Sequence, residues 1–279
     1  MRGRPGWFFT APAAVLFAIF FGYPLAASLV QSFQTDSDGE TVWAGLDNYT
    51  RLFQDPLVGR SLVNIALILA VQVPLMLVIA LGLAQVLNLS WLRFRSGYRV
   101  AYFLPAVTTL VAYAVVFRVL LNTDSGLLNQ LLGTHVDWLN DPTMARVALI
   151  GSITWRWTGY NMVILLAGLQ AIPKEQYEAA AIDGAGSLRT YVSVIVPQLR
   201  PVLLFCLITS TIGTLQLFDE SFVLTSGGPD NATLTPVLYL YENGFQHLDF
   251  GYAAAIAWLV VALTGLLSLV QFRALRTKS

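Results

Sequence analysis

The chain has 279 residues, of which 56% are hydrophobic and 11% are charged, and its 16 basic and 16 acidic residues give a formal net charge of zero. Soluble globular proteins carry roughly 25% charged residues, so this composition indicates an integral membrane protein. The balance of charge excludes a generally basic surface of the kind that binds nucleic acid.

Few residues could hold a cofactor. The single cysteine, Cys206, excludes an internal disulfide and a cysteine metal cluster. His135 and His247 stand in separate polar stretches without neighbouring ligands. The chain has no Gly-x-x-x-x-Gly-Lys-Ser/Thr phosphate loop. We therefore expect no metal and no other cofactor, and if ATP is used, another subunit binds it.

Six stretches have the roughly 20 mainly apolar residues that a membrane-spanning helix needs. We expect an all-α polytopic membrane protein, with one transmembrane domain over residues 1–279. The expected spans are residues 7–33, 61–87, 98–121, 145–169, 201–225 and 251–272.

The first apolar stretch could also be read as a secretory signal, because Arg2 and Arg4 precede it and small residues occur at 25–28. Its apolar part is much longer than the 7–15 residues of such signals. We favour a retained helix, with cleavage as the alternative.

Basic residues predict the orientation, because Lys and Arg concentrate in cytoplasmic loops. Eleven flank one side of the expected spans, whereas the first loop on the other side holds only Arg51 and Arg60. Both termini and the loop at 172–200 are therefore expected in the cytoplasm. The eleven residues are Arg2, Arg4, Arg93, Arg95, Arg99, Lys174, Arg189, Arg200, Arg273, Arg276 and Lys278.

The fourth span carries aromatic and amide side chains on one face. Trp157, Tyr160 and Asn161 follow the i, i+3, i+4 spacing of a helix. Aromatic planes with an amide suit a sugar, but the group could equally be an interfacial anchor. Arg156 would then pair with an acid on another helix, because a guanidinium inside a span faces the bundle interior or a cavity.

The fifth span is polar at its centre and includes Thr214 and Gln216. Hydroxyl side chains in spans often bond their own helix or a neighbour, so packing alone explains several of them. Asp219 and Glu220 follow on successive residues, which point in different directions on a helix. For this pair we expect a gate, a partner contact or an interfacial location rather than catalysis.

The polar stretch at 172–200 predicts two short helices. Pro173 suits a first helical position and Asp183-Gly184 a break, because glycine accepts the positive φ that commonly ends a helix. Tyr177 and Ala180 share one face of the first helix. Successive alanines let another surface approach the backbone closely, which is typical of a docking helix.

This stretch resembles the EAA loop of membrane permease subunits in ATP-binding-cassette importers. Residues 178–180 read Glu-Ala-Ala, Gly184 follows six residues after the glutamate, and Pro197 follows a hydrophobic pair. Asp-Gly-Ala at 183–185 looks like the form in the sugar-importing branch. Val194 and Val196 depart mildly from the family's usual Ile and Leu.

The resemblance implies that this loop is a coupling helix seated on a cytoplasmic ATPase. It implies that Glu178 makes a charged contact, that Ala179 and Ala180 allow close docking, and that Gly184 sets the exit turn. The residues assigned to coupling are Glu178, Ala179, Ala180, Asp183, Gly184 and Pro197.

The C-terminal part resembles the permease type found first of the two in maltose- and glycerol-3-phosphate-type importers. The resemblance is carried by Gly-Gly-Pro at 227–229 and Gly-Tyr-Ala-Ala at 251–254, while GLDNYTRLFQD at 45–55 resembles a recurring stretch of the same permeases. The expected substrate-path residues are Trp157, Tyr160, Asn161, Thr214, Gln216 and Tyr252.

The sequence thus indicates a permease subunit, not an enzyme, of a binding-protein-dependent importer in a prokaryotic inner membrane. It would move a sugar, an oligosaccharide or a polyol derivative such as glycerol phosphate by alternating access. The implied partners are a second homologous permease, two ATPase subunits and an extracytoplasmic binding protein. An ion-coupled secondary transporter is the alternative, and an intramembrane enzyme would need a catalytic set facing one cavity.

Overall fold

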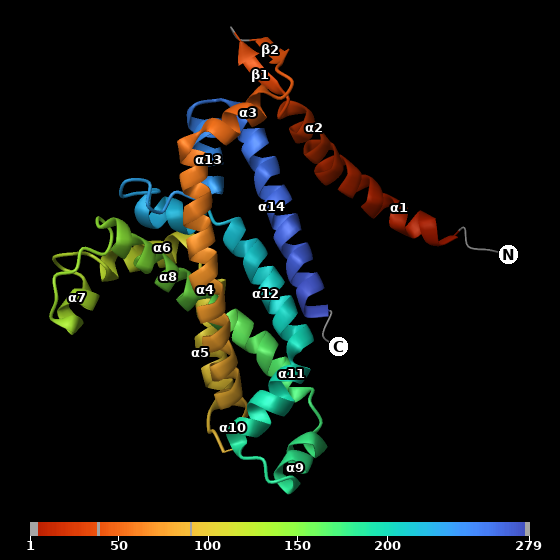
Figure 1. Ribbon diagram of the computed structural model, residues 1–279, viewed down its shortest axis with the longest axis vertical. Coiled ribbons are helices and arrows are strands. Elements are labelled where there is room, and N and C mark those ends of the chain that lie inside the picture. Colours follow the sequence, from red (N-terminus) through yellow and green to blue (C-terminus); the bar gives the residue numbers. More distant parts are fainter. Residues whose placement is uncertain (1–4, 38–39, 90, 277–279) are drawn as a thin grey trace. The chain divides into compact units, whose positions relative to one another are not determined.

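The computed structural model describes residues 5–37, 40–89 and 91–276, and this part of the chain is mostly helical (Figure 1). It divides into two compact units. Unit 1 comprises residues 1–59 and 239–262, and unit 2 comprises residues 60–238 and 263–279. Three helices continue from one unit into the other, and they are α4 (Pro56–Asn88), α13 (Pro236–Tyr241) and α14 (Phe250–Arg276).

Unit 1 begins with an apolar helical stretch made of α1, a π-helical turn and α2. A two-stranded antiparallel hairpin follows, in which Gln34 of β1 lies opposite Trp43 of β2. The short helix α3 comes after the hairpin, and a second π-helical turn precedes α14. The bounds are α1 Pro5–Phe17, the first turn Ala18–Gly22, α2 Tyr23–Gln31, β1 Gln34–Ser37, β2 Glu40–Trp43, α3 Asp47–Gln54 and the second turn Glu242–Gln246.

Helix α3 holds unit 1 together through polar side chains. The Asn48 amide nitrogen donates to the carbonyl oxygens of Ser32, at 3.0 Å, and Gln34, at 2.8 Å. One turn later the Arg51 guanidinium forms an ion pair with Asp249 at 2.6 Å. Successive turns of one short helix therefore bind the end of α2, the hairpin and the segment before α14.

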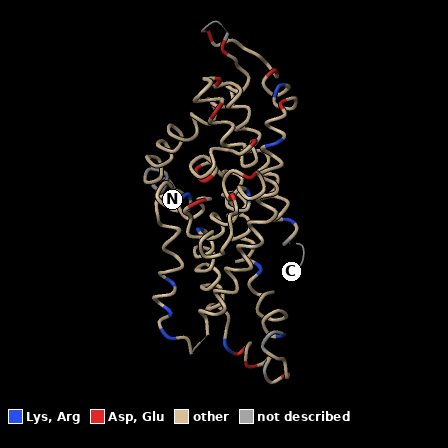
Figure 2. The backbone as a smooth tube through the Cα atoms, turned by 90° about the vertical axis from the view of Figure 1, so that its left-hand side faces the viewer, with Lys and Arg blue, Asp and Glu red and all other residues tan. Residues whose placement is uncertain are grey.

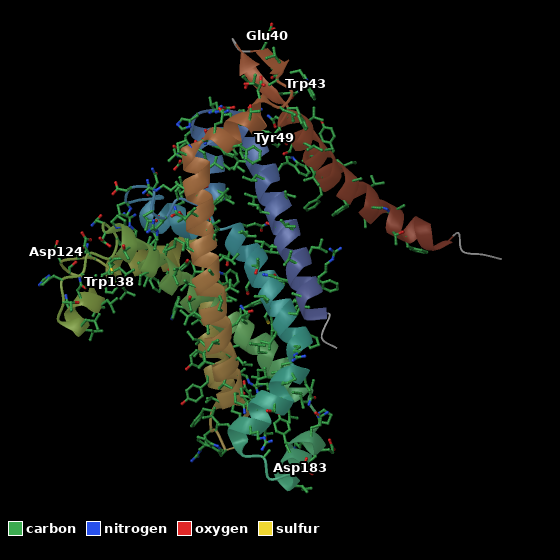
Figure 3. All side chains as sticks on the ribbon, viewed as in Figure 1. Glu40, Trp43, Tyr49, Asp124, Trp138 and Asp183 are labelled. Atoms are coloured by element: carbon green, nitrogen blue, oxygen red, sulfur yellow. The ribbon has the colours of Figure 1, made fainter. Side chains whose placement is uncertain are left out.

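Unit 2 contains most of the remaining helices. They are α5 (Arg95–Val107), α6 (Leu110–Leu120), α7 (Leu127–Leu132), α8 (Pro142–Gln170), α9 (Lys174–Ile182), α10 (Ser187–Thr190), α11 (Val196–Gln198) and α12 (Arg200–Leu215), with π-helical turns at Tyr191–Ile195 and Ser221–Thr225. Figure 3 labels Asp124 and Trp138 in the segment around α7, and Asp183 just after α9. The 29-residue helix α8 connects these two regions.

Local signals explain where α8 begins and how closely it packs. The Asp141 carboxylate accepts from the backbone N–H groups of Thr143 and Met144, and Pro142 occupies the first turn. Further along, Gly159 lies against the backbone of Tyr102 in α5, where a Cβ atom would collide with the Tyr102 carbonyl oxygen. The absence of a side chain at this glycine lets the two helices approach closely.

Small and branched side chains form the main core of unit 2. Ala80 and Ala84 of α4 and Met162 and Leu165 of α8 are fully buried in one cluster, together with Cys206 of α12. In a membrane protein such interhelical packing stabilises the bundle, since lipid chains are as apolar as the helices themselves.

The helices confirm the expected all-α membrane fold, apart from the β-hairpin. In the described part of the chain, three helical stretches are long and apolar enough to cross a membrane, at Phe9–Gln31, Pro56–Asn88 and Phe250–Ala274. Two bent pairs, 95–107 with 110–120 and 191–198 with 200–215, raise this number to five. Helix α8, on the expected fourth span, does not meet that test.

Two expected spans are not single straight helices. Residues 98–121 form α5 and α6, which meet at an angle of 98°. Pro105 lacks an N–H group for the helical ladder, and the Thr108 hydroxyl donates to the Pro105 carbonyl at 2.7 Å. The expected fifth span ends early, because α12 stops at Leu215 and a π-helical turn occupies 221–225.

Charged residues mark the ends of unit 2. In Figure 2, Lys and Arg lie near the beginning of α5, and α9 carries Lys174 together with the acidic residues Glu175 and Glu178. This distribution follows the basic loops on which the predicted orientation depends.

Candidate functional site

A cavity of about 390 Å³ lies within unit 2, between α4, α6, α8 and α12. It is lined by aromatic, amide, hydroxyl and carboxyl side chains together with apolar ones. The lining residues are Gln72, Met76, Leu110, Ile153, Trp157, Tyr160, Asn161, Thr209, Ser210, Gly213, Thr214, Gln216, Leu217, Phe218, Asp219 and Glu220.

Five of the six residues expected on a substrate path line this cavity. They are Trp157, Tyr160, Asn161, Thr214 and Gln216. The rings of Trp157 and Tyr160 meet edge to face, with centroids 5.9 Å apart. This pairing follows from their i, i+3 positions on α8 and leaves both side chains partly exposed.

Hydrogen bonds between helices orient the polar wall. The Thr214 hydroxyl donates to Oε1 of the Gln72 side chain at 3.1 Å, which joins α12 to α4. The Ser210 hydroxyl donates to Oδ1 of the Asn161 side chain at 3.4 Å, which joins α12 to α8. Gln72 was missed by sequence reasoning, although a lone amide inside an apolar span was a usable signal.

Asp219 and Glu220 also line the cavity, and Glu220 is only 5% exposed. We expected a gate, a partner contact or an interfacial location for this pair, and the burial of Glu220 does not fit the interfacial location. Arg156, one residue before Trp157, is also 5% exposed. Its guanidinium donates to the Thr108 carbonyl at 3.2 Å. This burial fits a guanidinium that faces the bundle interior. Among the described residues no ion pair joins Arg156 to an acid, so its pairing with an acid on another helix stays a prediction.

The sixth residue expected on the substrate path, Tyr252, does not lie at the cavity. It belongs to unit 1 and is fully buried. Its hydroxyl donates to Oδ2 of Asp55 at 2.7 Å, and the Arg51 guanidinium lies 3.9 Å from its ring centroid. The hydroxyl expected to meet a substrate is thus engaged inside the protein.

The Asp55 carboxylate is the centre of this second cluster. The Tyr239 hydroxyl donates to the same Oδ2 atom at 2.6 Å, and the Leu57 backbone N–H donates to Oδ1 at 2.8 Å. Burial raises the pKa of Asp55, but these hydrogen bonds outweigh it and leave the pKa below its ordinary value. Burial, followed by the bond to Asp55, raises the pKa of Tyr239 to about 12. Asp55 and Tyr239 therefore remain acceptor and donor at neutral pH.

The expected coupling residues lie on and after α9, apart from the cavity residues. Glu178 and Ala179 are exposed, whereas Ala180 is only 7% exposed and packs against its own chain. The Ala180 side chain therefore faces inward, and close docking at Ala179 and Ala180 stays a prediction. Burial raises the pKa of Tyr177 on the same inner face.

Helix α9 ends as its sequence predicts. Gly184 has a φ of +73°, and the Ala185 N–H donates to the Ala180 carbonyl at 3.0 Å. Asp183 is exposed, and Pro197 occupies the first turn of α11. Ile182 was missed by sequence reasoning: it is 85% exposed, which is unusual for so apolar a side chain at the end of a polar segment.

Residues 72–278 match the family described as "Binding-protein-dependent transport system inner membrane component". The chain belongs to this family. It is therefore a multi-pass permease component of the inner membrane, and the resemblance seen at the EAA loop is confirmed.

Similar curated proteins are sugar permeases by name. The lactose transport system permease protein LacF of Rhizobium radiobacter is 44% identical over 98% of this chain and 94% of its own length. The arabinooligosaccharides transport system permease protein AraP of Bacillus subtilis is 34% identical over 96% of this chain and 87% of its own length.

A solved structure supports the fold. A chain of a bacterial transporter described as importing the acidic polysaccharide alginate superimposes with a TM-score of 0.86, at 21% identity, over 98% of this chain and 96% of that one. The expected type I importer permease fold is thereby confirmed.

Proposed function

We propose that this chain is the membrane-spanning permease subunit of an ATP-driven importer that moves a carbohydrate by alternating access. The cavity carries the proposal, because Trp157 and Tyr160 offer ring faces for stacking while Asn161 and Thr214 offer hydrogen-bonding groups beside them. The curated relatives named for lactose and for arabinooligosaccharides support a sugar or oligosaccharide as substrate.

Coupling to ATP is proposed to pass through α9. Its exposed Glu178 would make a charged contact with a cytoplasmic ATPase, Ala179 would allow close approach, and Ile182 would supply an apolar contact. Gly184 and Asp183 set the exit turn, and Pro197 begins the return toward α12. The subunit itself catalyses no reaction in this proposal, because ATP is hydrolysed by its partners.

The proposed complex contains a second homologous permease, two ATPase subunits and an extracytoplasmic binding protein. Six spans would place both termini and the segment at 172–200 in the cytoplasm, as the basic loops indicate. ATP and the loaded binding protein each prefer one state of the permease, and this difference in affinity makes transport directional.

One observation favours a second candidate, an ion-coupled transporter that works without an ATPase. Acidic side chains in a membrane cavity are typical of ion and proton sites. Asp219 and Glu220 both line this cavity, and Glu220 is buried. The two functions differ in whether uptake requires ATP.

The test is reconstitution of this chain with its candidate partners, followed by ATPase and uptake assays across neutral and acidic sugars. We expect one sugar, presented by the binding protein, to stimulate ATP hydrolysis. Glu178→Lys should abolish the stimulation of ATP hydrolysis. Glu175→Lys makes the same charge reversal at another exposed position of α9 and should reduce the stimulation far less. Uptake by the isolated chain that follows an ion gradient and ignores ATP would establish the second candidate instead.

A further inference from the structure

The Arg156 side chain is buried but only partly bonded. It is 5% exposed, and its Nη2 atom donates to the Thr108 carbonyl at 3.2 Å. Nε and Nη1 of the same guanidinium have no hydrogen-bond partner among the described residues. A buried guanidinium with unbonded N–H groups is costly, so these groups call for a physical explanation.

The bonded side of Arg156 holds the break in the third span. Thr108 lies between α5 and α6, which meet at 98°, and its carbonyl has left the helical ladder. The guanidinium also lies 4.5 Å from the ring centroid of Tyr113 in α6 and 5.4 Å from that of Trp157 in α8. Arg156 thus joins the helix break to an aromatic side chain of the cavity wall.

The free side of Arg156 has a natural partner in Glu220. This carboxylate is 5% exposed, lines the cavity, and is attracted electrostatically by Arg156. The turn that follows it, 221–225, packs against both α6 and α8. The Tyr113 hydroxyl is buried close to both charges.

We propose that Arg156 is a positioning residue of the transport path, which holds the α5–α6 break through Thr108 in this state and pairs with Glu220 when the cavity rearranges. This inference rests on the proposed function. In the second state the Nε and Nη1 N–H groups of Arg156 donate to the Glu220 carboxylate. This ion pair neutralises the negative charge of Glu220 at the cavity wall. The α5–α6 segment thus has two defined arrangements, one with Arg156 bonded to Thr108 alone and one with Arg156 paired with Glu220.

The test is a double-mutant cycle in the reconstituted complex with its partner permease, ATPase and binding protein. Arg156→Gln leaves the Glu220 carboxylate without its partner, and Glu220→Gln does the same to the Arg156 guanidinium. Each variant should therefore lower sugar-driven uptake about tenfold or more. The double variant leaves no stranded charge and should recover to within about threefold of wild type. Uptake in the double variant that equals the product of the two single losses overturns the pairing.

Asp219 supplies the matched comparison, because it is the neighbouring carboxylate of the same cavity. Asp219→Asn combined with Arg156→Gln should give losses that multiply. Asp219→Asn could instead rescue uptake in Arg156→Gln as strongly as Glu220→Gln does. That result would mean that only the total charge of the cavity matters, and it would overturn the assignment to Glu220.

Arg156→Lys decides the matter even if the glutamine variant does not fold. Lysine keeps the positive charge but lacks the planar guanidinium. It therefore cannot bond the Thr108 carbonyl and then pair with the Glu220 carboxylate as arginine can. We expect a maximal uptake rate about threefold lower with unchanged apparent sugar affinity, because Arg156 does not line the cavity. A wild-type rate, or a change in affinity alone, contradicts the positioning role. A wild-type complex without sugar-stimulated ATPase activity would instead defeat the proposed function.

Discussion

The Tyr252 hydroxyl donates a hydrogen bond to Oδ2 of Asp55 at 2.7 Å, between residues 197 positions apart in the chain. Tyr239 donates to the same oxygen at 2.6 Å, so one carboxylate joins the end of α3 to α13 and α14 within unit 1. Bonds to an ionised group are among the stronger ones in proteins, which makes Asp55 a stabilising centre.

Loss of one of these bonds should destabilise the protein without altering its cavity. We expect Tyr252→Phe to lower the free energy of unfolding by about 1.5–3 kcal/mol, which is the usual range for a bond to a charged group. Thermal unfolding in detergent measures the change, and Tyr23→Phe, at a tyrosine that is 73% exposed, is the matched control. An equal loss in both variants would contradict the role given to Asp55.

The stability of this cluster should depend on acid pH. The pKa of Asp55 is lowered from 3.8 in the folded protein, so its contribution is complete above pH 3.8 and is lost as pH falls through the folded value. Wild-type melting temperature should therefore fall more steeply below about pH 4 than that of Asp55→Asn. Parallel pH profiles for the two proteins would show that the carboxylate is not preferentially bonded in the native state.

Sugar affinity should depend on which aromatic residue of α8 is removed. Trp157 lines the cavity, whereas Trp155 does not and instead lies against Phe117, with ring centroids 5.4 Å apart. Trp157→Ala should raise the sugar concentration for half-maximal uptake by roughly 3- to 10-fold, as expected for loss of one stacking contact. Trp155→Ala should leave that concentration unchanged, and a shift in both would place the sugar elsewhere.

The close contact of α5 and α8 gives a prediction about one glycine. A Cβ atom at position 159 would collide with the Tyr102 carbonyl, while one at Gly151 on the same helix would meet nothing within 4 Å. Gly159→Ala should cost about 1–3 kcal/mol of stability through overpacking, and Gly151→Ala should be neutral or stabilise by about 0.4–1 kcal/mol. Melting temperatures of the two variants distinguish steric contact from a general requirement for glycine.

The sequence by itself determined the features that depend on neighbouring residues. Hydropathy identified a membrane protein, and the EAA loop identified the family, because both signals lie in short continuous stretches. The helical spacing of Trp157, Tyr160 and Asn161 placed them on one face, and the structure brings all three to one cavity. Gly184 was recognised as a helix end for the same local reason.

Only the tertiary structure decided which of these residues work together. The cavity needs four helices in register, and Gln72 joins it because Thr214, 142 residues away, donates to its side chain. Tyr252 looked like a substrate residue until its distant partner Asp55 was known. The Thr108 carbonyl at the bend likewise accepts a hydrogen bond from Arg156 of another helix, 48 residues later. Such contacts are set by packing between segments far apart in the chain, and no local pattern of hydropathy or spacing carries that information.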